Sequence, residues 1–128
     1  LGISMVRLDF VKGGVNPPHL HPRATEMMVV MQGTIEAGFI TSLPEKRVIS
    51  KVLKTGEAFV FPTALIHYQK NVGEGPAYAL AALNSQNPGT LPALACVFGS
   101  KPKLSVDILT KSLDADANMV NQLLGKFK

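Results

Sequence analysis

Two histidines and a glutamate lie close together near the start of the chain. His19 and His21 are separated by one residue, and Glu26 follows five positions later. In an extended segment, side chains two positions apart point to the same side, so both imidazoles can approach one point. The odd step to Glu26 brings its carboxylate there only if residues 22–25 form a turn or bulge, which Pro22 favours. Two imidazoles and a carboxylate in a mostly apolar segment indicate a metal site.

The third histidine, His67, lies in a separate strand-turn-strand pattern between Gly56 and Asn71. We expect it to supply the fourth ligand from a distant strand, so that one site accounts for every histidine of the chain. Three neutral imidazoles and one carboxylate leave two positions of an octahedral ion open for water or substrate. Nitrogen and oxygen ligation without sulfur suits manganese, iron, zinc or nickel, and geometry alone does not choose among them.

Together the two segments resemble the germin-like branch of the cupin superfamily. The first is similar to the pattern G-x5-H-x-H-x4-E-x6-G, carried here by Gly14, His19, His21, Glu26 and Gly33. The second is similar to G-x5-P-x-G-x2-H-x3-N, carried by Gly56, Pro62, His67 and Asn71. It departs at Ala64, which replaces the usual glycine and puts the local turn geometry in question. The resemblance runs almost end to end and includes the N-S-Q-N-P-G of Asn84 to Gly89.

This resemblance implies an all-β cupin barrel, or jelly roll, that binds Mn2+ through His19, His21, Glu26 and His67. It also implies an extracellular protein of the apoplast, cell wall or secreted fluid, assembled as a homo-oligomeric trimer of dimers. Members of the family carry a preceding segment with a disulfide, which lies outside these 128 residues.

A redox-active ion with open positions could take an electron from one superoxide and give it to the next, which requires access for a small anion. Oxalate oxidation requires additional groups that orient a dicarboxylate. The resemblance implies two asparagines for that task, and this chain keeps Asn16 but has Val6 in the other position. Because valine forms no side-chain hydrogen bond, we rank manganese superoxide dismutase above oxalate oxidase. Asn16 is then a candidate residue near the metal, or a cap of the turn before Pro17.

Two other classes of function stay open. One is a peptidase that uses Cys96, the single cysteine, with a histidine. Cys96 lies in the apolar run 94–98, so a buried and inert thiol is the expectation. The other is a non-enzymatic storage, receptor or defence protein of the cell wall with a structural metal.

Composition limits the remaining possibilities. The chain has 128 residues, a length that is enough for one domain. Of these residues, 46% are hydrophobic and 17% are charged. Such an apolar composition in a short chain predicts surface buried against partner subunits. The net charge is +4, but the basic residues are scattered and aromatic residues make up only 6%, which disfavours nucleic-acid binding. No apolar stretch is long enough to span a membrane.

Short alternating segments with regular turn signals predict a β-sandwich or barrel over residues 1–102. The expected strands cover residues 3–11, 27–31, 34–42, 47–53, 58–61, 66–72, 77–83 and 91–98, with a ligand strand after Gly14. The run 27–31 reads as buried on both faces, with Met27, Met28 and Met31 as core residues. Arg23 is expected to form a structural ion pair.

The period changes to helical in the tail, residues 103–128. Ser105 is the expected N-cap of a helix to Leu113, and Asp116 that of a second helix. The second helix has apolar residues at helical spacing: Val120, Leu123, Leu124 and Phe127. We expect this helical extension to pack on a neighbouring subunit.

Overall fold

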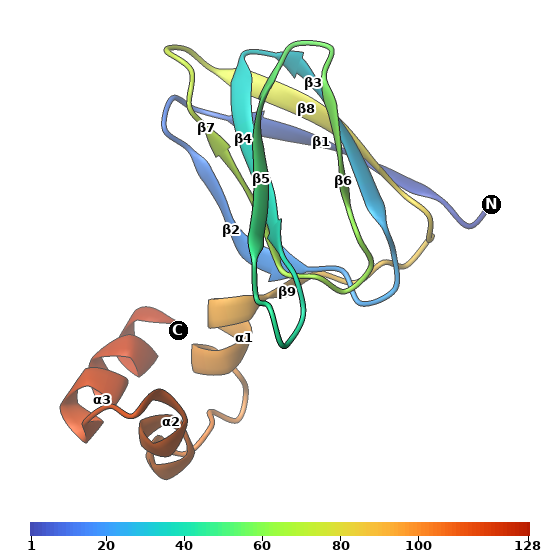
Figure 1. Ribbon diagram of the computed structural model, residues 1–128. Coiled ribbons are helices and arrows are strands. Elements are labelled where there is room, and N and C mark those ends of the chain that lie inside the picture. Colours follow the sequence, from blue (N-terminus) through green and yellow to red (C-terminus); the bar gives the residue numbers. More distant parts are fainter. The chain divides into compact units, whose positions relative to one another are not determined.

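The computed structural model describes residues 1–128 and divides the chain into two compact units, Leu1–Leu91 and Pro92–Lys128. The first unit is built from strands (Figure 1). Their bounds are β1 Ser4–Phe10, β2 Val15–Leu20, β3 Glu26–Gln32, β4 Thr34–Ile40, β5 Val48–Lys54, β6 Ala58–Phe61, β7 His67–Asn71, β8 Ala77–Leu83 and the short β9 Leu91–Pro92.

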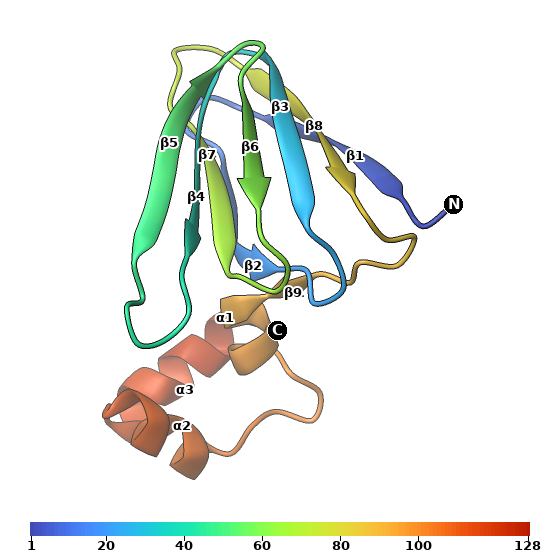
Figure 2. The same cartoon turned by 45° about the vertical axis from the view of Figure 1, so that its right-hand side comes forward.

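The strands form two antiparallel sheets that face each other (Figure 2). One sheet has the order β1-β8-β3-β6 and the other has the order β5-β4-β7-β2-β9. Only β4 and β5 are neighbours both in the chain and in a sheet, and every other connection crosses from one sheet to the other. The expected all-β jelly roll followed by C-terminal helices is confirmed.

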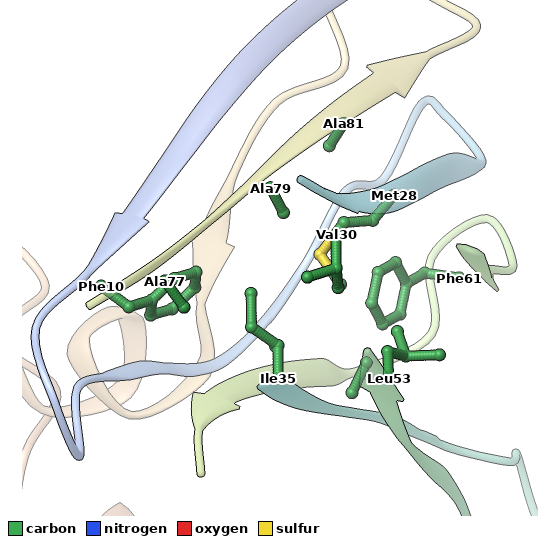
Figure 3. Close-up of a cluster of buried hydrophobic side chains, with 10 residues drawn as sticks. Phe10, Met28, Val30, Ile35, Leu53, Phe61, Ala77, Ala79 and Ala81 are labelled. Carbon is green, nitrogen blue, oxygen red and sulfur yellow. The ribbon is translucent and has the colours of Figure 1, made fainter. Parts of the chain in front are cut away.

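The core lies between the two sheets, where side chains from both inner faces meet (Figure 3). It consists of Phe10, Met28, Val30, Ile35, Ala37, Leu53, Phe61, Ala77, Ala79 and Ala81. Along β3, burial alternates: Met28 and Val30 are buried, whereas Met27 and Met31 are 56% and 40% exposed. The prediction that residues 27–31 are buried on both faces was therefore wrong, because only one face of this sheet is covered within the unit.

The second unit consists of three helices, α1 Ala93–Phe98, α2 Val106–Leu113 and α3 Ala117–Lys126. The predicted caps are confirmed: Ser105 Oγ accepts from Ile108 N at 3.3 Å, and Asp116 Oδ1 accepts from Met119 N at 2.8 Å. The apolar faces of the helices pack on one another around Phe98, Leu109, Val120 and Leu124. The apolar face of α3 is thus covered within its own unit. None of the three helices has the length and hydrophobicity of a membrane-spanning helix.

The predicted strand over residues 91–98 was wrong. The strand ends at Pro92, and Ala93–Phe98 is helical. The apolar run fits either period, but it contains the strong helix formers Ala93, Leu94 and Ala95 directly after a proline, which is tolerated at a helix start. Only one residue of this helix, Phe98, is buried.

Candidate metal centre

Four side chains that are far apart in the sequence converge at one end of the barrel. Their ligand atoms, one each from His19, His21, Glu26 and His67, all lie within 4.8 Å of one another. His19 is on β2, Glu26 is the first residue of β3, and His67 is the first residue of β7. His19 and His67 are also direct partners in the register of β2 and β7. The structure brings together the complete predicted ligand set.

Local backbone features explain how the sequence achieves this. A turn at Pro22-Arg23 separates His21 from β3 and brings the carboxylate of Glu26 to the histidines, as predicted. The Ala64 that replaces the usual glycine adopts φ +63°, a left-handed conformation that alanine tolerates at a cost of about 1 kcal/mol. Its N–H donates to the carbonyl of His21 at 3.0 Å, so the turn is kept and connects the two ligand segments.

The centre is buried, and its acceptors are close together. His19, Glu26 and His67 are 5%, 3% and 1% exposed. Glu26 Oε2 lies 2.9 Å from His21 Nε2 and 3.2 Å from His67 Nε2. One carboxylate oxygen therefore faces two imidazole nitrogens.

The other ring nitrogen of each histidine is held by a backbone carbonyl. His19 Nδ1 lies 2.7 Å from Pro17 O, His67 Nδ1 lies 2.9 Å from Leu65 O, and His21 Nδ1 lies 2.6 Å from Gly89 O. Because a carbonyl oxygen only accepts, each Nδ1 carries the proton and donates it. In the neutral form, a ring held in this way presents the lone pair of Nε2 to the centre, which is the arrangement that metal-binding histidines require.

This arrangement fits a cation. Lone pairs of imidazole nitrogens and a carboxylate oxygen about 3 Å apart repel one another unless a positive charge lies among them. Burial lowers the pKa of His19, so its ring stays neutral and able to ligate at lower pH than an exposed histidine would. The donor set of nitrogen and oxygen without sulfur suits a divalent transition metal.

A pocket of about 320 Å³ opens beside the ligands. Its polar lining other than the ligands comes from Ser4, Asn16 and Thr90, and its apolar lining comes from Met5, Val6, Leu8, Leu83 and Pro88. The candidate Asn16 and Val6 thus line the same pocket beside the ligands. Asn16 Nδ2 donates to Gln69 Oε1 at 2.8 Å, which holds its amide in place.

Sequence reasoning missed Gln69. Its side chain is fully buried, and its Nε2 has no hydrogen-bond partner within the chain. It lies two positions after His67 on β7, so the two side chains share one face of the strand. That spacing was the available signal, because a glutamine on the inner face of a strand beside a ligand needs a polar partner there.

Cys96 does not behave as predicted. It lies on α1 and is exposed rather than buried, because the apolar run around it is a helix with one buried residue instead of a core strand. All three histidines of the chain belong to the centre. A histidine partner for Cys96 would therefore have to leave the metal cluster or lie beyond these 128 residues.

Comparison with known proteins places the chain in a family. A family model described as Cupin matches residues 1–121. The chain belongs to the cupin family. "Germin-like protein subfamily 1 member 10" of Arabidopsis thaliana is 52% identical over 128 residues, which cover 100% of this chain and 57% of that relative. The expected germin-like resemblance of this cupin chain is confirmed, and the chain spans a little over half the length of such relatives.

Solved structures agree with this assignment. A structure of oxalate oxidase has a TM-score of 0.95 and 46% sequence identity over 98% of this chain and 63% of its own. Peruvianin-I, a cysteine peptidase from Thevetia peruviana latex, has a TM-score of 0.69 and 35% identity over 72% of this chain and 56% of its own. The fold is therefore shared with proteins whose names state different activities.

Proposed function

We propose that this cupin chain carries the active centre of an extracellular, manganese-dependent oxidoreductase whose main reaction is the dismutation of superoxide. The observation that supports it best is the convergence of His19, His21, Glu26 and His67 beside an open pocket. An oxidoreductase reaction agrees with the similarity to oxalate oxidase. Manganese is proposed among the possible ions on the germin-like resemblance.

The chain's own residues supply the ligands and shape the access. Three Nε2 lone pairs and the Glu26 carboxylate would hold the ion, which when bound supplies one-electron redox chemistry. The single carboxylate leaves a dipositive ion with a net positive charge, which attracts small anions. The carbonyls of Pro17, Leu65 and Gly89 fix the rings, so the ligands need no rearrangement when the substrate binds.

The pocket favours a small anion over a dicarboxylate. Val6, Leu8 and Leu83 form apolar lining and offer no hydrogen bond to a second carboxylate. Asn16 is the one amide that lines the pocket, and one of its two Nδ2 hydrogens is donated to Gln69, which leaves a single N–H for a ligand. A diatomic anion needs only the ion and space to reach it, whereas oxalate would lose an orienting contact at Val6.

The deciding experiment is metal analysis of the native protein together with a superoxide assay before and after chelation. We expect near-stoichiometric manganese and activity that is lost with the metal. Glu26→Gln should lose both, while Glu74→Gln, at an exposed surface carboxylate, should lose neither. Metal-loaded protein without dismutation would overturn the proposal.

Oxalate oxidation is the second candidate, favoured by the similarity to oxalate oxidase and by Asn16 in the pocket. The pure protein should be tested for hydrogen peroxide release from oxalate. A rate enhancement for this reaction that exceeds the rate enhancement for superoxide dismutation would reverse the ranking. Peptide cleavage that survives chelation and is blocked by alkylation of the exposed Cys96 would instead favour a peptidase. Metal-dependent stability without turnover of any oxygen species would favour a structural metal in a storage, receptor or defence protein.

A further inference from the structure

The three histidines of the centre differ in how their rings are held. His19 and His67 each donate from Nδ1 to a carbonyl two residues earlier, so the ligand strand itself fixes the ring. His21 donates to Gly89, 68 residues away in the loop between β8 and β9. The orientation of this one ligand therefore depends on the position of a separate segment.

Arg23 holds that segment. Its Nε donates to the carbonyl of Asn87 at 2.8 Å, and its Nη2 donates to Asn87 Oδ1 at 3.1 Å. Its backbone N–H donates to Pro88 O at 3.2 Å. Three hydrogen bonds from one residue thus bind the two residues that directly precede Gly89. Arg23 takes part in none of the salt bridges, so the predicted ion pair was wrong and the guanidinium serves the loop instead.

The loop fits closely against this arginine. Gly89 has φ +72°, and a Cβ at this position would lie 2.8 Å from Arg23 Nη2 and 3.1 Å from Pro22 Cγ. Glycine is therefore favoured by the backbone conformation and by the close approach of the loop to the turn at Pro22-Arg23. This contact sets the Gly89 carbonyl 2.6 Å from His21 Nδ1.

We propose that Arg23 is a positioning residue for the metal centre. By fixing Asn87 and Pro88, it places the Gly89 carbonyl that selects the Nδ1–H tautomer of His21 and aims Nε2 at the ion. Arg23 is exposed, its guanidinium donates to neutral acceptors and it does not line the pocket, so it acts only through the loop. The inference rests on the proposed metal centre, and its test separates the two.

The first readout is the imidazole tautomer in the metal-free protein, by long-range 1H–15N NMR near pH 8. In the wild-type chain all three rings should be Nδ1–H tautomers. In Arg23→Met the signals of His21 should move toward a tautomer mixture, while His19 and His67 stay unchanged because their acceptors are local. Arg23→Lys should restore His21 only in part, since an ammonium is a point donor and does not span both Asn87 oxygens as the guanidinium fork does.

The second readout is the manganese dissociation constant. Loss of outer ligand support typically costs roughly tenfold to hundredfold in metal affinity, and we expect a loss of that size for Arg23→Met. Arg47→Met, at an arginine in the loop between β4 and β5, is the matched control and should bind as the wild-type chain does. If Arg23→Met does not fold, Asn87→Ala provides the test, because it removes only the Oδ1 acceptor of Arg23. This variant should shift the tautomer of His21 and weaken manganese binding, both to a smaller degree than Arg23→Met.

An unchanged His21 tautomer together with an affinity within about twofold of the Arg47→Met control would overturn the proposal. A uniform shift of all three histidines would also overturn it, because it would show a general loss of structure instead of a loss at one ligand. If the wild-type chain binds no manganese, the proposed function fails, yet the tautomer of His21 still tests the role of Arg23.

Discussion

At the scale of single residues, Val6 has the largest consequence for the choice of substrate. It lies on β1, pairs with Ala81 in the strand register and contributes to the lining of the pocket beside the ligands. At Val6 the pocket wall offers no side-chain hydrogen bond to a second carboxylate, whereas Ser4, Asn16 and Thr90 supply the polar lining elsewhere. Changing this one side chain should therefore alter selectivity without disturbing the ligands.

We predict that Val6→Asn improves oxalate binding. A hydrogen bond to a charged ligand contributes about 1.5–3 kcal/mol, and because the wild-type side chain is 41% exposed we expect the lower end, about a tenfold lower dissociation constant. Oxalate titration of the metal-loaded protein and hydrogen peroxide release measure the effect. Val48→Asn, at an exposed valine on β5, is the matched control and should change neither. An unaltered dissociation constant would show that Val6 does not determine the preference.

At the scale of elements, the barrel depends on tight turns that set the strand register. Gly33 lies between β3 and β4 with φ +86°, and a Cβ there would lie 2.6 Å from the Cβ of Ala77, the first residue of β8. Gly56 has nearly the same φ, +88°, but nothing lies within 4 Å of its virtual Cβ. The two glycines differ in crowding and share the same conformational demand.

We predict that Gly33→Ala destabilises the chain more than Gly56→Ala. The positive φ costs each alanine about 1 kcal/mol, and the overlap with Ala77 adds about 1–3 kcal/mol at residue 33 only. Urea denaturation of both variants measures the difference in the free energy of unfolding. Equal losses would mean that the strands move apart at no cost, which a packed core does not allow.

Local sequence patterns determine some of these elements and leave others open. Most strands were predictable because turn residues bound them, and the ligand set was predictable because spacing and parity restrict where side chains point. Met27 and Met31 were misjudged because a run of apolar residues does not reveal which face of a sheet is covered. Residues 93–98 were misjudged because six apolar residues fit a helix and a strand equally well. Gln69 and the Arg23–Asn87 contact depend on tertiary packing, which no local pattern records.

At the scale of the whole molecule, the ligands connect the two sheets. His19 and His67 belong to the sheet of β2 and β7, whereas Glu26 belongs to the sheet of β3. An ion bound by all of them would close one end of the barrel, where the lone pairs otherwise repel. Metal binding is then coupled to the stability of the fold.

We predict that chelation lowers the midpoint of thermal unfolding. Free metal at a hundred times its dissociation constant stabilises the folded state by about 2.7 kcal/mol, which is lost with the ion. The destabilisation should concentrate at the centre, so amide hydrogen exchange should rise in β7 and the start of β3 more than in β5. Glu26→Gln should unfold at the same temperature with and without chelator. A midpoint that chelation does not change would show that the ligands carry no folding free energy.

The surface of the barrel unit suggests that copies of the chain associate. On the outer face of the sheet β1-β8-β3-β6, the register places Met5, Ala82, Met27 and Val60 in one row. Met5, Met27 and Val60 are 70%, 56% and 50% exposed, an apolar row that a monomer rarely leaves open to water. The helical unit separately exposes Leu94, Ile108 and Met119. We propose that the chain forms a homo-oligomer through both surfaces, since a trimer of dimers needs two different interfaces.

We predict that one charge introduced into either surface disrupts one of the two interfaces and leaves the other intact. Met27→Lys and Ile108→Lys should each give a smaller particle than the wild-type protein, because a lysine buried at an interface without a partner charge loses its hydration. If the two surfaces form different interfaces, the two particles should differ in mass, and the double variant should be monomeric. Light scattering coupled to size exclusion measures the masses, and Ser42→Lys, in the exposed loop after β4, is the control for added charge. A wild-type mass for both variants would exclude these surfaces as interfaces.

Unchanged manganese content in the smaller particles would show further that each chain completes its own metal centre, as the four ligands within one chain require.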